Sequence, residues 1–208
     1  MNMLVVGNDK IAQRLLAELS DVSNLLIVMD RSNSLGRVVR LLRRGTLRLS
    51  DIFKMGLAEW RRPAFPGTAS RIAASVTSNA ELIELIRTHR PQRIYLFRAG
   101  LIINRAVLAE GVEVLNFHSA SIRTHGGLAS IRRALDDNVL EQAATLHRVT
   151  SRIDEGEIIA EQPYRLDRGK SYFCNEQTAY AAGITLALAV LRDRPETQEA
   201  GPGNWNEA

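Results

Sequence analysis

The residues best suited to chemistry lie in the second half of the chain. Asn116 and His118 close the segment VLNFH (residues 114–118), and residues two apart in a strand leave the same face. An amide donor and an imidazole would then stand side by side at the carboxyl end of a strand, where open α/β sheets place their sites. Taken singly, the asparagine also fits an ordinary turn, and the histidine fits a hydrogen-bonded core or surface position.

A second polar pair follows further along the chain. His147 lies within a predicted strand over residues 144–152, and Asp154 stands in the turn IDEG (residues 153–156) that follows it. A carboxylate so placed could orient an imidazole or favour its charged form. The spacing therefore allows an Asn/His/Asp acid–base site, although it does not name the reaction.

Alternating strand and helix patterns must position these side chains. Short apolar runs predict strands over residues 3–7, 24–30, 71–76, 93–97, 113–117, 144–152 and 158–166. Helical patterns cover residues 11–19, two stretches within 34–65, the region behind the capping box at 78–81, and residues 105–110, 128–136 and 171–193. Such alternation favours parallel strands with right-handed crossovers. We predict a Rossmann-like, three-layer α/β fold whose mostly parallel, twisted sheet is flanked by helices.

One domain accounts for the length. A chain of 208 residues with ordinary apolar and charged content fits a single α/β domain, which we assign to residues 1–194. Gly, Pro, Glu and Asn dominate residues 195–208, so we expect a disordered tail there. The helix predicted over residues 171–193 carries more apolar residues than one face needs, which leaves a homodimer contact open.

The composition also restricts the compartment. The single cysteine, Cys174, excludes an internal disulfide framework and a cysteine-based zinc site, and it fits a reducing compartment. The apolar start of the chain reaches Asp9 after a stretch too short for a signal peptide or a membrane span. We therefore expect a cytoplasmic protein with no metal and no membrane partner.

Basic residues gather in one stretch of the sequence. The net charge is +4, and residues 31–62 hold nine basic and two acidic side chains. Such a stretch could bind phosphates or nucleic acid, or it could be the solvated face of a helix. The arginines from 37 to 48 have no aromatic residue between them on which a base could stack, so we expect no nucleic-acid partner. A solvated face and an anionic small molecule both stay open.

The first part of the chain outlines a dinucleotide-binding unit but lacks its fingerprint. A strand, a glycine, a helix and a second strand ending in an acid run from Gly7 to Asp30. The turn GNDK offers one glycine where a pyrophosphate needs two or three. Asp9 would also place negative charge where the pyrophosphate must lie. We therefore disfavour nicotinamide binding.

Residues 116–162 resemble the folate-dependent formyltransferases. The segment reads NFHSASIRTHGGLASIRRALDDNVLEQAATLHRVTSRIDEGEIIAEQ. It is similar to the family's Asn-x-His run, its glycine and Ala-Leu helix, its Thr/Ser-Val-His strand, and its Asp-x-Gly turn followed by Ile-Ile. Upstream, RAGLII (residues 98–103) looks like the family's folate-pocket loop. The resemblance implies the formyltransferase fold and the transfer of a formyl group from 10-formyltetrahydrofolate to an amine.

The resemblance also implies roles for individual residues. Asn116 and His118 would donate hydrogen bonds to the oxyanion that develops on the formyl group. Asp154 would raise the pKa of His118 and relay a proton. Other implied residues would form apolar walls for the pterin (Leu101, Ile102, Ile103 and Leu115), offer backbone groups to its edge (Thr150, Ser151, Arg152 and Ile153), or support the site from behind (Thr145 and His147). A purely structural role for His147 stays open.

Two substitutions depart from the family pattern. Ser119 and Arg123 stand where prolines are usual, so we expect the loop of residues 119–127 to be less rigid. Arg123 and His125 could hold a carboxylate or phosphate of the acceptor, or they could simply lie at the surface. We expect a small-molecule amine acceptor that is anionic. A nucleotide-linked amino sugar is the first candidate, ahead of an amino acid, a peptide or a hydroxylamine.

Other functions fit the same resemblance. Formyltetrahydrofolate hydrolases carry an extra N-terminal domain, whereas Met3 opens the first predicted strand here, so we disfavour that activity. No C-terminal β-domain is expected, which argues against initiator tRNA, and the first turn lacks the glycine-rich phosphate segment of the glycinamide ribonucleotide enzyme. A catalytically silent folate-binding homologue is the remaining alternative.

Overall fold

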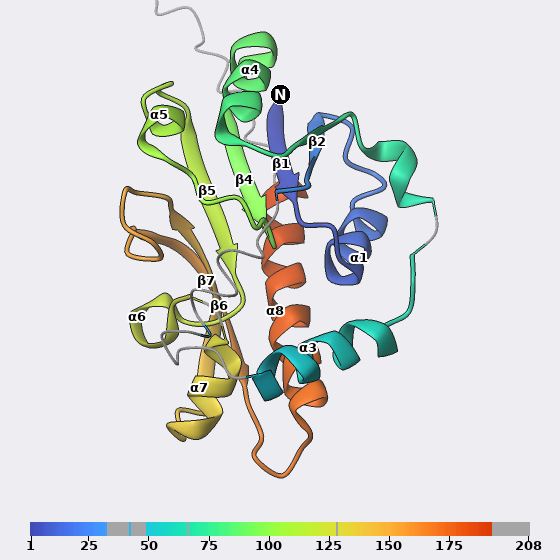
Figure 1. Ribbon diagram of the computed structural model, residues 1–208, viewed down its shortest axis with the longest axis vertical. Helices are drawn as coiled ribbons and strands as arrows, with labels where there is room; N and C mark the ends of the chain where they lie inside the picture. The colour runs from blue at the N-terminus through green and yellow to red at the C-terminus, as the bar shows by residue number, and fades with distance from the viewer. Residues whose placement is uncertain (33–41, 43–48, 66, 128, 193–208) are drawn as a thin grey trace, which may run out of the picture.

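Seven strands form one sheet in the computed structural model, which describes residues 1–32, 42, 49–65, 67–127 and 129–192 (Figure 1). The strands are β1 (Asn2–Val6), β2 (Leu25–Asp30), β3 (Ala74–Val76), β4 (Arg93–Phe97), β5 (Glu113–His118), β6 (Glu141–Arg148) and β7 (Ile158–Arg165). Their order in the sheet is β3-β2-β1-β4-β5-β6-β7. β1 to β5 pair in parallel, while β6 and β7 are antiparallel. The predicted mostly parallel α/β fold is confirmed.

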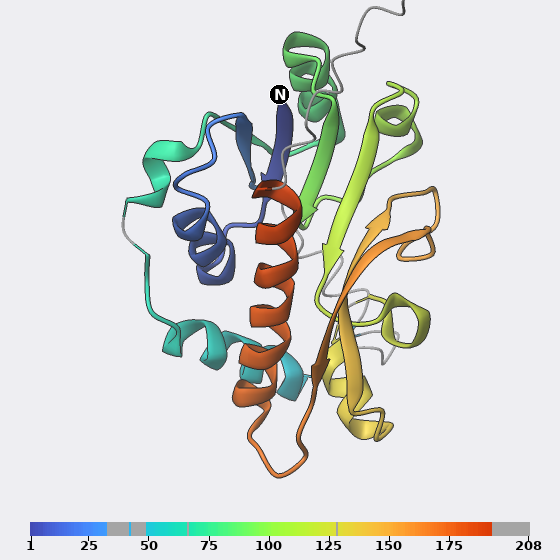
Figure 2. The same ribbon diagram turned by 180° about the vertical axis from the view of Figure 1, so that it is seen from behind.

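Helices cover both faces of this sheet. They are α1 (Lys10–Glu18), α3 (Leu49–Arg61), α4 (Asn79–His89), α5 (Arg105–Leu108), α6 (Ile122–His125), α7 (Ser130–Asp136) and α8 (Tyr172–Arg192), with the 3-10 helix η1 (Thr68–Arg71). Figure 2 shows α8 running along one face with α1 beside it, and one apolar cluster joins these helices to the strands. A second cluster packs α4 and α5 against the opposite face. No helix in the described ranges is long and apolar enough to cross a membrane.

The alternation of side chains in β5 separates apolar from polar groups. Leu115 and Phe117 are buried in the cluster that contains α8, and Val114 belongs to the cluster on the other face. Asn116 and His118 have the same parity as Val114, so they leave the sheet on that second face. The strand therefore delivers the two polar side chains together at its carboxyl end.

The structure moves several predicted boundaries. β3 begins at Ala74 rather than at residue 71, because Arg71 ends η1 and its guanidinium donates to the carbonyls of Leu16 and Val22. β6 begins at Glu141 and ends at Arg148, and residues 149–152 form a bent loop instead of continuing the strand. The apolar excess of α8 is accounted for by its packing on the sheet and on α1 and α7. The first helix expected within residues 34–65 and the tail over 195–208 lie outside the described residues.

Candidate active site

Asn116 and His147 meet across the β5–β6 pair. In that register Asn116 lies opposite His147, and His118 lies opposite Thr145. Nδ2 of Asn116 is 3.1 Å from Nε2 of His147, while Nδ1 of His147 is 3.2 Å from the carbonyl oxygen of Arg148. A neutral imidazole satisfies both contacts when its Nδ1–H donates to the carbonyl and its Nε2 accepts from the amide. The amide of Asn116 then has a second N–H to offer to another partner.

A left-handed turn brings Asp154 to the same histidine. The φ angle of Asp154 is 53°, and its Oδ1 is 3.5 Å from Nε2 of His147. Oδ2 accepts a hydrogen bond of 2.6 Å from the backbone N–H of Gly127. A backbone donor fixes the orientation of a carboxylate. The structure thus brings Asn116, His147 and Asp154 together, with His147 in the middle.

Close packing around Asp154 requires one glycine and favours a second. A Cβ on Gly156 would lie 1.7 Å from the carbonyl oxygen of Arg148, and a Cβ on Gly126 would lie 3.1 Å from Cβ of Asp154. The Asp-x-Gly spacing therefore has a physical reason. The glycine lets the turn approach the end of β6, and the aspartate two residues earlier then reaches the histidine.

His118 carries the unsatisfied atom of this group. Its Nε2 is buried and has no hydrogen-bond partner among the residues that the structure describes. Burial lowers the pKa of His118, and this effect outweighs the charge of Asp154 and a backbone hydrogen bond with His125, which raise the pKa. His147 and Arg133 lower it further. The predicted effect of Asp154 is therefore present, but the net change in pKa has the opposite direction because the imidazole is desolvated.

An open cavity of about 610 Å³ lies beside Asp154. Its walls are formed by Ile122, Arg123, Asp154, Glu155, Gly156, Glu157 and Ile158. Three of the charged side chains that line the cavity form ion pairs with residues outside it. These pairs are Arg123 with Glu161 at 3.5 Å, Glu155 with Arg152 at 3.2 Å, and Glu157 with Arg148. Within the described part of the chain, no three His, Cys, Asp or Glu side chains are grouped to hold a metal ion.

Side chains of β6 and β7 fasten the loop that follows β5. The hydroxyl of Tyr164 donates to the carbonyl of Ser119 at 2.6 Å, and the hydroxyl of Thr145 donates to the carbonyl of Ala120 at 3.2 Å. These contacts act where the family's proline is replaced by Ser119. Thr145 is fully buried, so it supports the loop from behind. Tyr164 was missed because no local pattern links it to a loop so distant in the sequence.

His125 corrects one prediction. The residue is 4% exposed, with Nδ1 3.0 Å from Oγ1 of Thr124 and Nε2 3.1 Å from Oδ2 of Asp137. Both ring nitrogens are engaged within the protein, so His125 anchors the loop and does not offer a donor to an acceptor molecule. Arg123 is exposed at the cavity wall, and its role in acceptor binding stays a prediction.

The predicted apolar walls fall on different faces of the sheet. Leu115 is buried in the cluster with α8, on the face opposite to Asn116, so the structure does not bring it to the polar group. Leu101 and Ile103 pack into the cluster on the same face as Val114, and Ile102 is exposed beside them. These three residues remain candidates for the pterin walls.

The turn before Asp154 is exposed at the surface. Oγ1 of Thr150 accepts a hydrogen bond of 3.2 Å from the N–H of Arg152, which stabilises the turn locally. Ser151, Arg152 and Ile153 are all exposed. Their backbone groups are accessible to a ligand, and their contact with a pterin stays a prediction.

Asp30 holds the loop that carries Leu101. Its Oδ2 accepts a hydrogen bond of 2.6 Å from the N–H of Leu101, and its Oδ1 accepts one of 2.7 Å from the N–H of Ser32. The side chain is buried. Both carboxylate oxygens therefore accept hydrogen bonds from the backbone. This structural role accounts for an acid at the end of β2 without a bound ribose.

In the turn after β1, the carboxylate of Asp9 interacts with the N-terminus of α1 and with a guanidinium. Asp9 caps α1 by accepting a hydrogen bond of 2.9 Å from Ala12, and it pairs with Arg98 at 2.7 Å. A Cβ on Gly7 would lie 2.3 Å from the carbonyl oxygen of Arg98. Gly7 is thus needed for the contact with the residue that follows β4.

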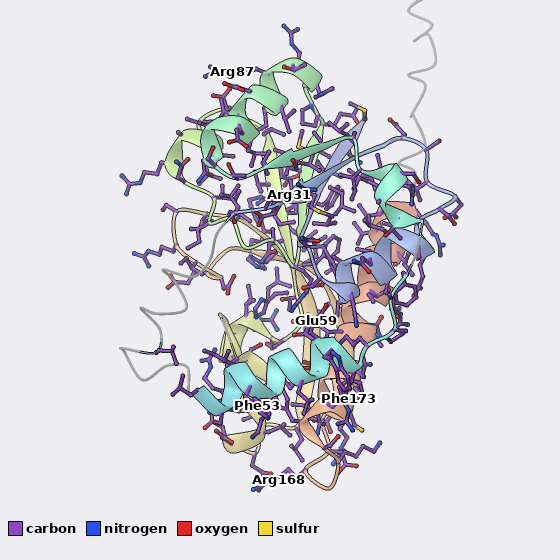
Figure 3. The ribbon with its side chains drawn as sticks, turned by 45° about the vertical axis from the view of Figure 1, so that its right-hand side comes forward. Arg31, Phe53, Glu59, Arg87, Arg168 and Phe173 are labelled. Carbon is purple, nitrogen blue, oxygen red and sulfur yellow. The ribbon has the colours of Figure 1, made fainter. Side chains whose placement is uncertain are left out.

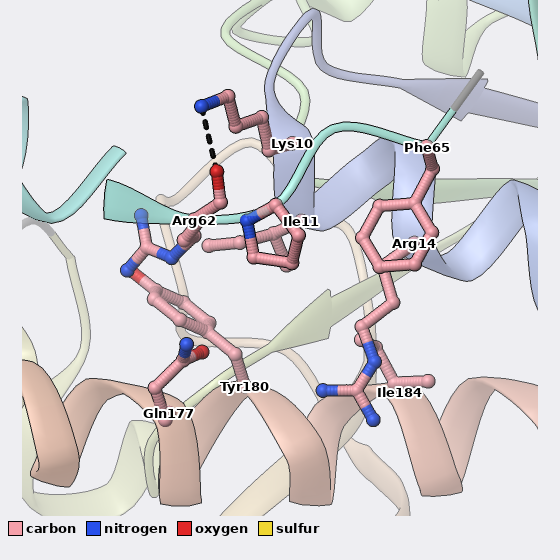
Figure 4. A pocket seen from close by; sticks show the side chains of 9 residues that line it. Lys10, Ile11, Arg14, Arg62, Phe65, Gln177, Tyr180 and Ile184 are labelled. Carbon is pink, nitrogen blue, oxygen red and sulfur yellow. Dashed lines mark hydrogen bonds between the residues drawn. The ribbon is translucent and has the colours of Figure 1, made fainter. Parts of the chain in front are cut away.

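A smaller pocket of about 210 Å³ lies next to this turn, between α1 and α8 (Figure 4). Nζ of Lys10 donates to the carbonyl of Arg62 at 2.7 Å, and the guanidinium of Arg62 pairs with buried Glu176 at 2.6 Å. Tyr180 lies beneath the guanidinium of Arg62, which is 5.4 Å from the ring centroid. Lys10 and Arg62, which line this pocket, thus make their main contacts with other groups of the protein.

The fold and the polar group at the carboxyl edge of its sheet define a Rossmann-like α/β protein with a site built on β5, β6 and the following turn. The sequence matches the family described as Formyl transferase (Formyl_trans_N) over residues 3–173, and the chain belongs to that family. A methionyl-tRNA formyltransferase from Fervidobacterium nodosum is 22% identical over 119 residues, which cover 57% of this chain and 38% of that protein. The chain thus spans well under half the length of this relative.

Solved structures share the fold. A phosphoribosylglycinamide formyltransferase from Streptococcus pneumoniae superposes with a TM-score of 0.64 and 15% identity, covering 92% of this chain and 97% of that one. A formyltetrahydrofolate deformylase from Pseudomonas syringae pv. tomato gives a TM-score of 0.62 and 19% identity, covering 92% of this chain and 61% of that one. At these identities the likeness shows the common fold alone.

Proposed function

We propose that the chain transfers a formyl group from 10-formyltetrahydrofolate to the amine of a small acceptor. The observation that carries the proposal is the unpaired Nε2 of His118, buried beside Asn116 and under the charge of Asp154. A buried polar atom without a partner costs free energy in a finished fold, and this one belongs to the polar group beside the cavity at Asp154, so a group of the substrate would satisfy it there. Membership of the formyl transferase family supplies the class of reaction.

The residues present fit such a donor. 10-formyltetrahydrofolate would supply the formyl group and, at N10, the leaving nitrogen. Nε2 of His118, when it carries a proton, and the second N–H of Asn116 would hydrogen-bond to the formyl oxygen as negative charge develops on it. Leu101 and Ile103 would shield the pterin from water, because they lie on the same face as Asn116.

Asp154 would move the proton. Gly127 occupies its Oδ2, so Oδ1, the oxygen 3.5 Å from His147, is the one left to accept a proton from the attacking amine. In the complete reaction the bond between the formyl carbon and N10 breaks, the bond to the acceptor nitrogen forms, and one proton passes from the amine to N10. His147 would hold Asn116 in place by accepting its N–H, and the backbone N–H of Gly127 would hold Asp154.

A nucleotide-linked amino sugar stays the first candidate for the acceptor. Its support is the basic composition of residues 31–62, much of which lies outside the described residues. In the cavity, Arg123 is a guanidinium placed to meet an anionic group near Asp154. The carboxylates of the same walls favour the amine end of the acceptor, so the acceptor would carry both an amine and an anion.

One assay tests the proposal and separates its alternatives. The purified chain is incubated with 10-formyltetrahydrofolate and a panel of amines that begins with nucleotide-linked amino sugars and includes amino acids and hydroxylamine. Release of tetrahydrofolate only in the presence of one amine supports the transferase. Release without any amine would instead show a hydrolase, the activity named for the deformylase of the same fold. Folate binding without turnover would show a catalytically silent protein.

A further inference from the structure

One peptide group links α7 to Asp154. The carbonyl oxygen of Gly126 and the N–H of Gly127 belong to the same trans peptide, so they point in opposite directions. The carbonyl accepts a hydrogen bond from Nη2 of Arg133, and the N–H donates to Oδ2 of Asp154 at 2.6 Å. The peptide therefore lies between a guanidinium and a carboxylate, and each charge strengthens the hydrogen bond that the other receives.

The helix α7 holds the loop before it at two points. α6 and α7 lie side by side (Figure 1). Asp137, directly after α7, binds Nε2 of His125 at 3.1 Å, and Arg133 binds the carbonyl of Gly126. These contacts restrain the end of the loop of residues 119–127, which lacks the prolines that are usual in the family. The loop therefore depends on side chains of α7 for its position.

Arg133 has no counter-charge in the described part of the chain. The residue is partly buried, it forms no ion pair with a described carboxylate, and its buried Nε has no hydrogen-bond partner there. The preceding arginine of the same helix, Arg132, pairs with Asp136 at 2.6 Å. A partly buried cation without a counter-ion lowers the stability of a fold. Its presence beside the site indicates a role towards the groups around it.

His118 also lies within the field of this guanidinium. Burial lowers the pKa of His118, and the charges of His147 and Arg133 lower it further, while Asp154 and a backbone hydrogen bond with His125 raise it. Arg133 thus acts on two residues of the site. It reaches Asp154 through the peptide and His118 through its charge.

We propose that Arg133 is a positioning residue of the active site, whose guanidinium holds and polarises the peptide between Gly126 and Gly127 and so fixes the carboxylate of Asp154. With Oδ2 bound firmly to Gly127, Oδ1 keeps its place for the transfer of a proton. The catalytic consequence rests on the proposed function. The bridge from Arg133 to Asp154 does not, because it is present in the protein without substrate.

Nuclear magnetic resonance of the ¹⁵N-labelled full chain tests the bridge without any substrate. Arg133→Met keeps an unbranched side chain and removes both the charge and the donor. The amide proton of Gly127 should move upfield and exchange with solvent about tenfold faster or more, because its hydrogen bond to Asp154 weakens. The pKa of His118, followed by its carbon-bound ring protons, should rise because a nearby positive charge is gone.

Two further variants separate charge from hydrogen bonding. Arg133→Lys keeps the charge and a donor, so the Gly127 amide and the pKa of His118 should stay close to the wild type. Arg133→Gln keeps a donor without the charge, so the pKa of His118 should rise as it does in Arg133→Met. Because Arg133→Gln is polar, it also provides the test if Arg133→Met does not fold.

Turnover measures the consequence for the reaction. Arg133→Met should lower kcat by about 10- to 10²-fold with little change in the KM for 10-formyltetrahydrofolate, because Asp154 is less well placed. Arg133→Lys should recover most of the lost kcat. Arg168→Met is the matched control, since it removes the same charge from an exposed arginine that Figure 3 shows at the rim of the molecule. It should match the wild type in every measurement.

Three results would overturn the proposal. The first is a folded Arg133→Met whose Gly127 amide and His118 pKa are those of the wild type. The second is an equal loss of kcat and of melting temperature in Arg133→Met and Arg133→Lys, which would show a purely structural role. The third is the same change in Arg168→Met. A wild type that transfers no formyl group would contradict the proposed function, and the resonance measurements would still decide whether Arg133 holds Asp154.

Discussion

Two polar clusters lie at the carboxyl edge of the same sheet, and they use their charges differently. After β1 and β4, Asp9 pairs with Arg98, and the hydroxyl of Tyr180 accepts a hydrogen bond of 2.9 Å from that guanidinium. At the β5–β6 pair and the turn after β6, Asn116 contacts His147 and Asp154 lies 3.5 Å from the same ring, but Nε2 of His118 has no partner in the described part of the chain. In the first cluster the carboxylate of Asp9 and the guanidinium of Arg98 are paired with each other, whereas in the second cluster the ring nitrogen of His118 has no such partner. Under the proposed function, this difference assigns the chemistry to the second cluster.

The largest expected effect comes from the second cluster. Asn116→Ala and His118→Ala should each lower turnover by about 10²- to 10³-fold, because each removes a donor to the developing oxyanion. Asp154→Asn should lower it by about 10²- to 10⁴-fold, since the amide still accepts from Gly127 but cannot take a proton. Release of tetrahydrofolate in the presence of the acceptor measures these losses.

His89→Ala is the control for these three variants, because His89 is an exposed histidine at the end of α4. It should keep full turnover. The melting temperatures of the His118, Asp154 and His89 variants should lie close to the wild type, and Asn116→Ala should melt lower because buried Nε2 of His147 loses its donor. Near-normal activity of His118→Ala would mean that its unpaired nitrogen does not meet the substrate, and the contrast between the clusters would lose its functional meaning.

Glycine substitutions sharpen the comparison, because both clusters contain a glycine in close contact with backbone. A Cβ would lie 2.3 Å from a carbonyl oxygen at Gly7 and 1.7 Å from one at Gly156. Gly7→Ala and Gly156→Ala should each destabilise the protein by about 2 kcal/mol or more, measured by urea unfolding. Under conditions where both variants are folded, only Gly156→Ala should also reduce turnover, because its turn carries Asp154.

Gly56→Ala provides the reference for these measurements. Gly56 lies within α3, and apart from its own helix turn and chain neighbours an added Cβ would meet nothing within 4 Å. Alanine there should stabilise the helix by about 0.5–1 kcal/mol. A loss at Gly56 equal to that at Gly156 would show that the close carbonyl contact is not the cause.

The fold was predictable because its buried strands are continuous apolar runs. β1 and β4 are paired in the centre of the sheet, and a run without alternation is typical of strands covered on both faces. The capping box at Ser78 was also predicted, and its hydroxyl accepts from the N–H of Glu81 at 3.3 Å. α6 was not predicted, since a helix of four residues is too short for a periodic pattern.

The site was predictable only in part. The positions of Asn116 and Asp154 followed from local motifs, but the contact between Asn116 and His147 depends on the β5–β6 register, which includes an irregularity in β6 next to His147. The misplacement of Leu115 was avoidable, because the neighbour of Asn116 in a strand must face the other way. The pairing of His125 with Asp137 had no local signal, since it depends on how the loop packs against α7.

Removing the acid of the first cluster should affect stability and leave turnover unchanged. Asp9→Ala loses the N-cap of α1 and the pair with Arg98, so we expect the free energy of unfolding to fall by about 1–2 kcal/mol. Asp9→Asn keeps an oxygen that can cap the helix and should lose less. Urea unfolding and the tetrahydrofolate assay measure the two effects. A large loss of turnover in both variants would join the first cluster to the active site.

The smallest expected effect is a dependence of stability on pH that belongs to the second cluster. Burial lowers the pKa of His147 below 6.5, although the backbone of Arg148 and the charge of Asp154 act to raise it. Burial also lowers the pKa of His118. Above pH 6.5 these imidazoles are neutral in both the folded and the unfolded chain, and their contribution to stability is complete. Below that pH the unfolded chain binds protons that the folded chain does not, so the free energy of unfolding falls. For each histidine the slope is at most about 1.4 kcal/mol per pH unit, and the fall ends at the pKa of the folded state.

Urea unfolding between about pH 7.5 and pH 5.5 measures this loss, and His147→Gln should reduce it. The hydrogen bond with Arg148 lowers the pKa of Glu113. The stability that Glu113 contributes is therefore lost only below the ordinary glutamate pKa of 4.5, outside the pH range of this measurement. Burial raises the pKa of Glu176, which opposes the histidines as the pH falls, but this effect is common to the wild type and the variant. The difference between their slopes therefore isolates His147. Identical slopes would mean that His147 is not held neutral by its surroundings, and that the hydrogen bond from Asn116 does not depend on an unprotonated Nε2.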